Sequence, residues 1–550
     1  MSASSKKKLR KEQEAAKLTE RQIAAQQEAK KLNLYTTIFV VAMALILVIA
    51  VTVGISQFIS NSGIREKNTT ALTVGSHELS NAELNYFYID AVNSFYSQNG
   101  QYASFFGLDT TVPLDEQVFD EATGQTWADY FVESASATAK AVYAMNDAAA
   151  AEGYTLPESE KSQVDAILSS FSTYAGLYGF SDAQSYLKAM YGKGATEEGM
   201  RAYLEMSLLA DSYKAAHQES LTYTDADLRA AEAENFDKYS SYSYNSYYLA
   251  ASRFQEGGTT DEEGNTTYSD EEKAAAVAAA KEAAETVIAG EIASVADLDA
   301  AIAALPINAD TAAKSTAYTD NAYGSIDDEL SAWLSDDARK EGDVACIANT
   351  TVSTDESGNE TTEALGYYVV YFLSENDNAF PMKNVRHILV SFEHDHSESE
   401  DHDHTDTAYT DAEKATAKTA AEELLAQWQA GEATEASFAA LATEKTDDTG
   451  SAANGGLYED VYPGQMVAAF EDWCFDEGRK AGDTGIVETE YGYHVMYFVG
   501  NSDTTYRDFQ IRNELASKDH NDWYNGIVDA MAVTAGDSKY LTRDIVLAGN

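Results

Sequence analysis

The chain has 550 residues, enough for several domains that each bury a core. Its 91 acidic residues outnumber its 37 basic residues and give a net charge of −54, which repels nucleic acids and favours basic protein partners. The two cysteines, Cys346 and Cys474, are too few for a disulfide framework, and we expect them to be small buried residues. The strong negative charge excludes a nucleic-acid-binding role.

The charge is distributed unevenly along the chain. Residues 1–33 carry a net charge of +5, and the remainder carries −59. Residues 34–59 form an apolar run without charges that is long enough to cross a bilayer, and no small-residue cleavage site follows it. The pattern predicts a transmembrane signal-anchor that crosses the cell membrane once, with the basic tail in the cytoplasm and the bulk of the chain outside.

Residues 70–238 are predicted to form a mostly helical domain. A short strand at Ala71–Gly75 opens it, and Ser80 followed by Glu83 is the capping box of its first helix. Aromatic residues recur throughout; we expect most of them in the core and some along a groove for unfolded segments. The C-terminal residues 503–550 are expected to return and complete this domain.

Two apolar strands later in the chain each carry one histidine. The first is Val385–Ser391 with His387, and the second is Tyr491–Phe498 with His494. Between them the sequence contains a helix with the capping box Thr410–Glu413, a second short helix, a Gly-Gly turn and the motif G-Q-M-V-A-A-F-E. The expected order is strand, two helices, strand, helix and two strands.

These motifs resemble the parvulin family of peptidyl-prolyl isomerases, in the form found in PrsA- and SurA-type foldases. The resemblance covers residues 381–500 and implies cis–trans isomerisation of X-Pro bonds without a cofactor. The turn Gly455–Val461 departs from the family's usual G-G-D-L-G-x-F. The resemblance implies a catalytic network made of His387, Asp448, Thr489, Tyr491 and His494, and a proline-binding slot made of Met466 and Phe470 with Tyr458 at its rim.

Residues 239–376 repeat the pattern of this segment. Ser331–Asp343 aligns with Glu471–Asp483, and Gly366–Phe372 aligns with Gly492–Phe498. The alignment places tyrosines at the two histidine positions, Tyr248 for the first and Tyr368 for the second. We therefore predict a degenerate parvulin-like module that keeps the fold but lacks the polar half of the site.

An insertion after the first histidine strand alternates histidines with carboxylates. Such a set suits zinc or nickel, and a weak metal site is one interpretation. A solvated acidic loop without a specific metal is the other. The candidate ligands are His394, His396, His402 and His404.

The sequence as a whole predicts an α+β multidomain fold. It combines one N-terminal transmembrane helix, a SurA-like helical chaperone domain and two tandem parvulin-like modules. The predicted function is that of a bacterial membrane-anchored extracytoplasmic foldase, which isomerises X-Pro bonds in exported or unfolded clients and acts as a chaperone. A non-enzymatic holdase that uses the modules as a scaffold is the alternative, and a metal-binding surface protein is a third. The histidine pair favours the enzyme, because a pure scaffold does not need it.

Overall fold

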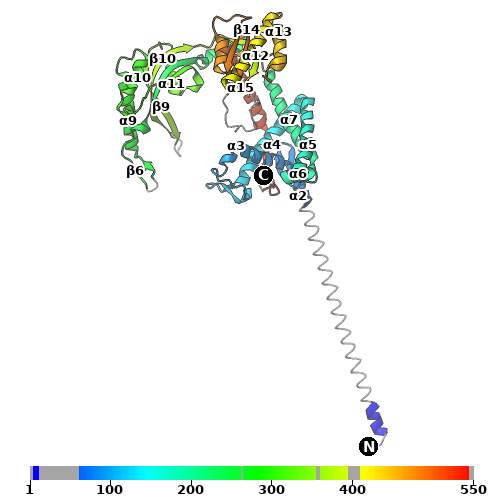
Figure 1. Ribbon diagram of the computed structural model, residues 1–550. Helices are drawn as coiled ribbons and strands as arrows, with labels where there is room; N and C mark the ends of the chain where they lie inside the picture. Colours follow the sequence, from blue (N-terminus) through cyan, green and yellow to red (C-terminus); the bar gives the residue numbers. More distant parts are fainter. Residues whose placement is uncertain (1–3, 12–60, 262–263, 355–358, 394–408, 544–550) are drawn as a thin grey trace. The chain divides into compact units, whose positions relative to one another are not determined.

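The computed structural model describes residues 4–11, 61–261, 264–354, 359–393 and 409–543. The chain divides into two compact units. The first consists of Met1–Leu221 with Lys518–Asn550, and the second of Thr222–Ser517. Both helices and strands occur in each, which agrees with the predicted α+β class (Figure 1).

The predicted transmembrane signal-anchor is contradicted. Crossing a bilayer takes about 20 predominantly apolar residues in one helix. Among the described residues, no helix has both that length and that hydropathy. The predicted single pass through the cell membrane is contradicted by the same finding. The apolar run 34–59 and the histidine-rich insertion 394–404 lie outside the described residues.

The first unit combines helices with a three-stranded antiparallel sheet of order β15-β1-β2. Leu72 of β1 lies opposite Ala535 of β15, so the C-terminal residues pair with the strand that opens the unit. The capping box at Ser80 is present and starts α3. The strands are β1 (Thr70–Val74), β2 (His77–Ser80), β3 (Val118–Asp120), β4 (Gln125–Thr126) and β15 (Val533–Ala535). The helices are α2 (Ile64–Asn68), α3 (Asn81–Asn99), α4 (Trp127–Glu152), α5 (Glu158–Leu177), α6 (Ala183–Tyr191) and α7 (Glu197–Ser220), and α15 (Tyr506–Ala530) contributes residues to both units.

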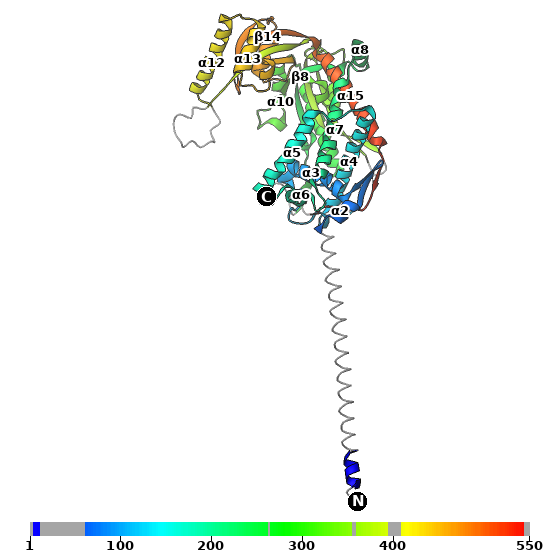
Figure 2. The ribbon, with the colours of Figure 1, turned by 90° about the vertical axis from the view of Figure 1, so that its right-hand side faces the viewer.

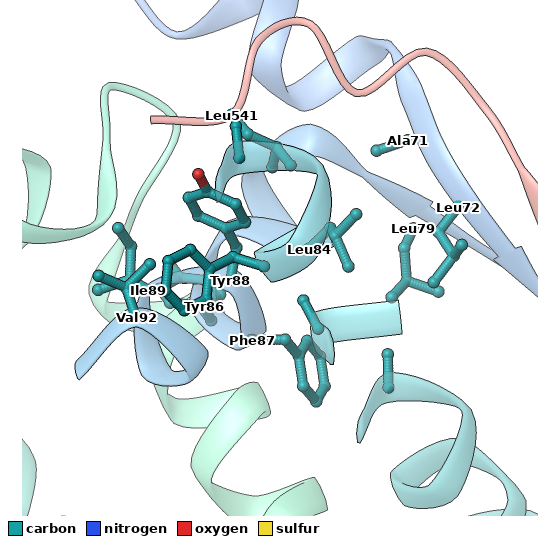
Figure 3. Packing of buried hydrophobic residues seen from close by; sticks show 14 of the residues in the cluster. Ala71, Leu72, Leu79, Leu84, Tyr86, Phe87, Tyr88, Ile89, Val92 and Leu541 are labelled. Atoms are coloured by element: carbon teal, nitrogen blue, oxygen red, sulfur yellow. The ribbon is translucent and has the colours of Figure 1, made fainter. Parts of the chain in front are cut away.

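The core of the first unit gathers around α3 (Figure 3). Leu84, Tyr88 and Val92 are spaced one helical turn apart and are at most 2% exposed, so they define the buried face of this helix. Leu72 of β1 and the C-terminal Leu541 belong to the same cluster. Apolar residues from distant parts of the chain therefore share one core.

The second unit contains two four-stranded antiparallel sheets with the same connectivity. Their strand orders are β8-β5-β10-β9 and β12-β11-β14-β13. The first sheet and its helices comprise β5 (Ser241–Ala250), α9 (Asp270–Ile288), α10 (Val295–Ala303), β8 (Thr316–Ala322), α11 (Asp328–Leu334), β9 (Val344–Thr354) and β10 (Glu360–Asn376). The second comprises β11 (Pro381–Ser391), α12 (Asp411–Ala430), α13 (Glu435–Lys445), β12 (Leu457–Val461), α14 (Ala468–Phe475), β13 (Thr484–Thr489) and β14 (Gly492–Thr505). The remaining elements are α8 (Asp225–Glu234) and a small hairpin of β6 (Thr259–Thr260) and β7 (Thr266–Thr267).

Each of these sheets carries helices on both faces. In the second sheet, Ile388 and Val495 share a core cluster with residues of α12 and α13. Figure 2 shows these two helices beside β14. Val385 and Met496 face the other way, toward α14. Because side chains alternate between the faces of a strand, His387, two residues after Val385, also lies on the α14 face.

Candidate active site

The two histidines predicted from the sequence meet on neighbouring strands of the second sheet. His387 of β11 lies opposite Met496, and His494 of β14 lies opposite Leu389, so the two imidazoles are diagonal neighbours on one face. Their Nδ1 atoms are 2.9 Å apart, and their rings are stacked with centroids 5.2 Å apart. Both are nearly inaccessible to solvent, with exposed fractions of 3% and 5%.

A hydrogen-bond network extends from both ends of the histidine pair. On one side, His387 Nε2 lies 2.9 Å from Asp448 Oδ2 and 3.2 Å from Ser451 Oγ. The hydroxyl of Ser451 donates to the same carboxylate oxygen at 2.5 Å. On the other side, Thr489 Oγ1 lies 2.8 Å from His494 Nε2. The network therefore joins four segments of the chain through buried or half-buried polar atoms.

The direction of each hydrogen bond follows from the charge of Asp448. Burial raises the pKa of this carboxyl, but the hydrogen bonds from Ser451, His387 and Tyr458 outweigh burial and lower it to about 2. The ionised carboxylate can only accept, so His387 carries its proton on Nε2. Its bare Nδ1 then accepts from Nδ1–H of His494, whose bare Nε2 accepts from the hydroxyl of Thr489. One tautomer of each imidazole is thereby selected.

Both imidazoles are neutral near pH 7. Burial lowers the pKa of His387, and the hydrogen bond and charge of Asp448 only partly oppose this effect. Burial, together with the neighbouring His387, lowers the pKa of His494 to about 4. The contact between His387 and Asp448 is therefore a hydrogen bond to a carboxylate rather than an ion pair.

These pKa values predict a loss of stability in mild acid. The pKa of His494 falls from its ordinary 6.5 to about 4 on folding. As the pH drops through this window, the unfolded chain binds a proton that the folded chain does not, so the free energy of unfolding should fall by roughly 3 kcal/mol. Urea unfolding at pH 7 and at pH 4.5 measures the change. His494→Gln, whose amide cannot titrate, should remove this part of the pH dependence, and an unchanged dependence would contradict the assignment.

An aromatic and aliphatic patch covers the imidazole pair. The ring of Phe470, on α14, is nearly perpendicular to both imidazoles, with centroids 5.5 Å from His387 and 5.4 Å from His494. Half-buried Met466 packs in the same cluster. Tyr458 of β12 lies beside His387 and donates its hydroxyl to Asp448 at 2.9 Å. Apolar and aromatic side chains therefore lie directly against the polar network.

A glycine turn fixes the edge of β12 against β11. The backbone N–H of His387 donates to the carbonyl of Gly456 at 2.8 Å. Gly456 has a φ of +71°, and a Cβ at this position would lie 2.1 Å from the carbonyl oxygen of His387. The sequence of this turn differs from the usual family motif. Its second glycine, Gly456, is nevertheless required, because the two backbones approach so closely here.

The structure brings seven of the eight predicted site residues together through their side chains. Tyr491 differs, because its backbone N–H donates to Thr489 Oγ1 while its side chain is 59% exposed. Ser451 joins the network although the sequence analysis did not identify it. Its place three residues after Asp448, in a turn of Asp-Thr-Gly-Ser, was the available signal. The four candidate metal ligands of the insertion lie outside the described residues.

The corresponding place in the first sheet has a different chemistry, and its register corrects the sequence alignment. Val370 lies opposite Ser246 there, as Met496 lies opposite His387 in the second sheet. Ser246, not Tyr248, therefore occupies the position of His387. The sequence alignment had paired Tyr248 with His387 and was displaced by two residues. A shift of two residues leaves a side chain on the same face of the strand, so the pattern of apolar residues did not reveal the error.

Comparisons with known proteins agree with this geometry. Residues 368–501 match the family of the PPIC-type PPIase domain. Foldase protein PrsA 1 of Listeria innocua is 40% identical over 62 residues, which are 11% of this chain and 21% of that protein. Chaperone SurA of Chromohalobacter salexigens is 50% identical over 64 residues, 11% of this chain and 14% of that protein. The matched part thus spans about a fifth or less of these relatives.

Solved structures of similar proteins include PrsA from Bacillus subtilis. The two chains align over 75% of this chain and 88% of that protein, with 15% sequence identity and a TM-score of 0.26. PrsA from Bacillus cereus covers 30% and 56% at 26% identity, with a TM-score of 0.17. The family match and the local identities, rather than these superpositions, confirm the resemblance inferred from the motifs. Residues 368–501 are therefore similar to the parvulin-type proteins that carry a PPIC-type peptidyl-prolyl isomerase domain.

Proposed function

We propose that this protein is a peptidyl-prolyl cis–trans isomerase that acts on unfolded polypeptides and also binds them as a chaperone. The observation that carries the proposal is the buried imidazole pair of His387 and His494 beneath Phe470, inside the segment that matches the isomerase family. The matched relatives named foldase and chaperone support the choice of unfolded chains as clients.

The geometry suggests how the barrier to rotation is lowered. Rotation about an X-Pro bond sacrifices amide resonance, which makes the planar imide more polar than the twisted one. An apolar surface of Phe470 and Met466 removes water from the planar form and so disfavours it relative to the twisted form. The hydrogen-bonded network holds Phe470 from below, and no atom of the network needs to form a covalent bond.

A direct test is the rate of cis-to-trans conversion of a prolyl peptide with the full chain present. We expect a clear acceleration over the uncatalysed process, which takes roughly 10–100 s. A rate equal to that of the peptide alone would favour the alternative, a holdase that uses the module as a scaffold.

We propose that residues 239–376 are an inactive copy of the same module. The two copies share their strand order. They also share a cation–π contact just after the corresponding helices α11 and α14. Arg339 lies over the ring of Trp333, and Arg479 lies over the ring of Trp473, each at 3.9 Å. Ile326 and Leu330 supply an apolar cluster like that of Met466 and Phe470. The imidazoles, however, are replaced by Ser246 and Tyr368, so this copy lacks the polar network.

The two copies can be compared by removing one phenol oxygen from each. Tyr368→Phe deletes a hydroxyl that donates to Asp327 and accepts from Asn349, and should cost about 1 kcal/mol of stability with no change in isomerisation. Tyr458→Phe deletes the hydroxyl that donates to Asp448, and should slow isomerisation about tenfold. Urea unfolding and the peptide assay measure the two effects. Slower isomerisation in Tyr368→Phe would show that the first copy takes part.

A further inference from the structure

A second binding site is suggested by a hollow in the first unit. Its volume is about 480 Å³, and it lies between α3 and α4. Asp90, Ser94 and Phe95 of α3 line one side, Tyr130 and Phe131 of α4 the other, and Tyr203 of α7 completes the lining. The proposed isomerase chemistry uses none of these residues.

Aromatic rings form much of the wall. Phe95 lies 6.4 Å from Tyr130 and 5.8 Å from Phe131, measured between ring centroids, and these contacts are edge-to-face. Phe119, which is 41% exposed, packs on Tyr130 at 4.4 Å and extends the aromatic surface outward. Rings in such an arrangement can present their electron-rich faces to a cation within about 6 Å.

The hollow contains one carboxylate that has no cationic partner in its lining. Asp90 is the only charged side chain among the described residues that line it. The hydroxyl of Tyr203 donates to its Oδ2, which leaves Oδ1 and the second lone pair of Oδ2 for another donor. Burial raises the pKa of Asp90, and the hydrogen bond from Tyr203 opposes this effect. A bound cation would stabilise the ionised form of Asp90.

We propose that this hollow binds an arginine side chain of an unfolded client segment with neighbouring apolar residues. A guanidinium fits better than an ammonium, because it can donate two parallel hydrogen bonds to Asp90 and stack on the rings of Phe95 and Tyr130. The net charge of −54 attracts basic segments to the protein. The inference rests on the proposed chaperone function in naming the ligand, but not on isomerase activity.

The test is the binding of a short fluorescein-labelled peptide to the full chain, followed by fluorescence polarisation. The peptide contains a central Phe-Arg-Phe flanked by glycine and serine, and its partner peptide carries Phe-Gln-Phe. Neither contains proline, so an inactive isomerase domain does not affect the result. We expect the arginine peptide to bind about tenfold more tightly, with an affinity that falls as salt is raised.

Three variants separate the site from general surface charge. Asp90→Asn keeps the size of the side chain and should reduce the affinity for the arginine peptide to that for the glutamine peptide. Asp211→Asn makes the same change on α7 at a side chain that is 68% exposed, and should leave the affinity unchanged. Ser94→Arg, at an exposed position one turn after Asp90, should place a guanidinium in the hollow and block the peptide even if Asp90→Asn folds poorly.

Two outcomes would overturn the proposal. One is equal binding of the arginine peptide by Asp90→Asn, Ser94→Arg and the unaltered chain. The other is an equal loss in Asp90→Asn and Asp211→Asn, which would assign the attraction to net charge. Either result would leave the isomerase proposal intact, because that proposal is tested by the peptide-bond assay.

Discussion

A chain in which both His387 and His494 are replaced by alanine should isomerise a prolyl peptide about 100-fold more slowly than the unaltered chain, the scale expected when a reactive geometry is displaced by about 1 Å. The pair supports Phe470 from below, with both ring centroids within 5.5 Å of it. Removing both imidazoles opens a cavity beneath the slot and takes one hydrogen-bond partner from each of Asp448 and Thr489.

The single variants should each cause most of this loss. The two imidazoles share one hydrogen bond of 2.9 Å, so removing either member breaks the chain from Thr489 to Asp448. His77→Ala is the matched control, because His77 bonds Asp147 in the first unit, whereas the histidine pair belongs to the second. Circular dichroism checks that the variants are folded. Full activity in the double variant would contradict the isomerase role of the pair and favour the holdase alternative.

Short-range patterns explain which features could be predicted from the sequence. The alternation of apolar residues around His387 and His494 indicated two strands, and the capping boxes at Ser80 and Thr410 mark the starts of helices α3 and α12. The family resemblance indicated residues that the structure brings together, because its motifs occur at fixed separations. These predictions depended on contiguous residues or on a known family arrangement.

Features that depend on pairing between distant segments were missed or misplaced. The substitution of Ser246 for a histidine became visible only from the register of β5 against β10. The hydrogen bond from Ser451 to Asp448 depends on the path of a turn. The predicted membrane anchor rested on local sequence features, and no helix among the described residues supports it. The hollow at Asp90 is formed by three helices whose contacts no local pattern specifies.

The largest effect on stability is expected from Gly456→Ala. The added Cβ would lie 2.1 Å from the carbonyl oxygen of His387 and 3.0 Å from Cβ of Ala442, so the turn must move away from β11. That movement stretches the hydrogen bond of 2.8 Å from the N–H of His387 to the carbonyl of Gly456. Together with the positive φ of +71°, the substitution should lower the free energy of unfolding of this unit by about 3 kcal/mol or more.

Gly464→Ala separates conformational strain from close approach. Gly464 also has a positive φ, +84°, but a Cβ there would meet nothing within 4 Å. It should cost only about 1 kcal/mol, the penalty of the backbone conformation alone. Urea unfolding monitored by circular dichroism compares the two variants, and equal losses would contradict the steric explanation. Because the displaced turn leads directly into β12, Gly456→Ala should also move Tyr458 away from Asp448 and slow isomerisation, whereas Gly464→Ala should leave that hydrogen bond in place.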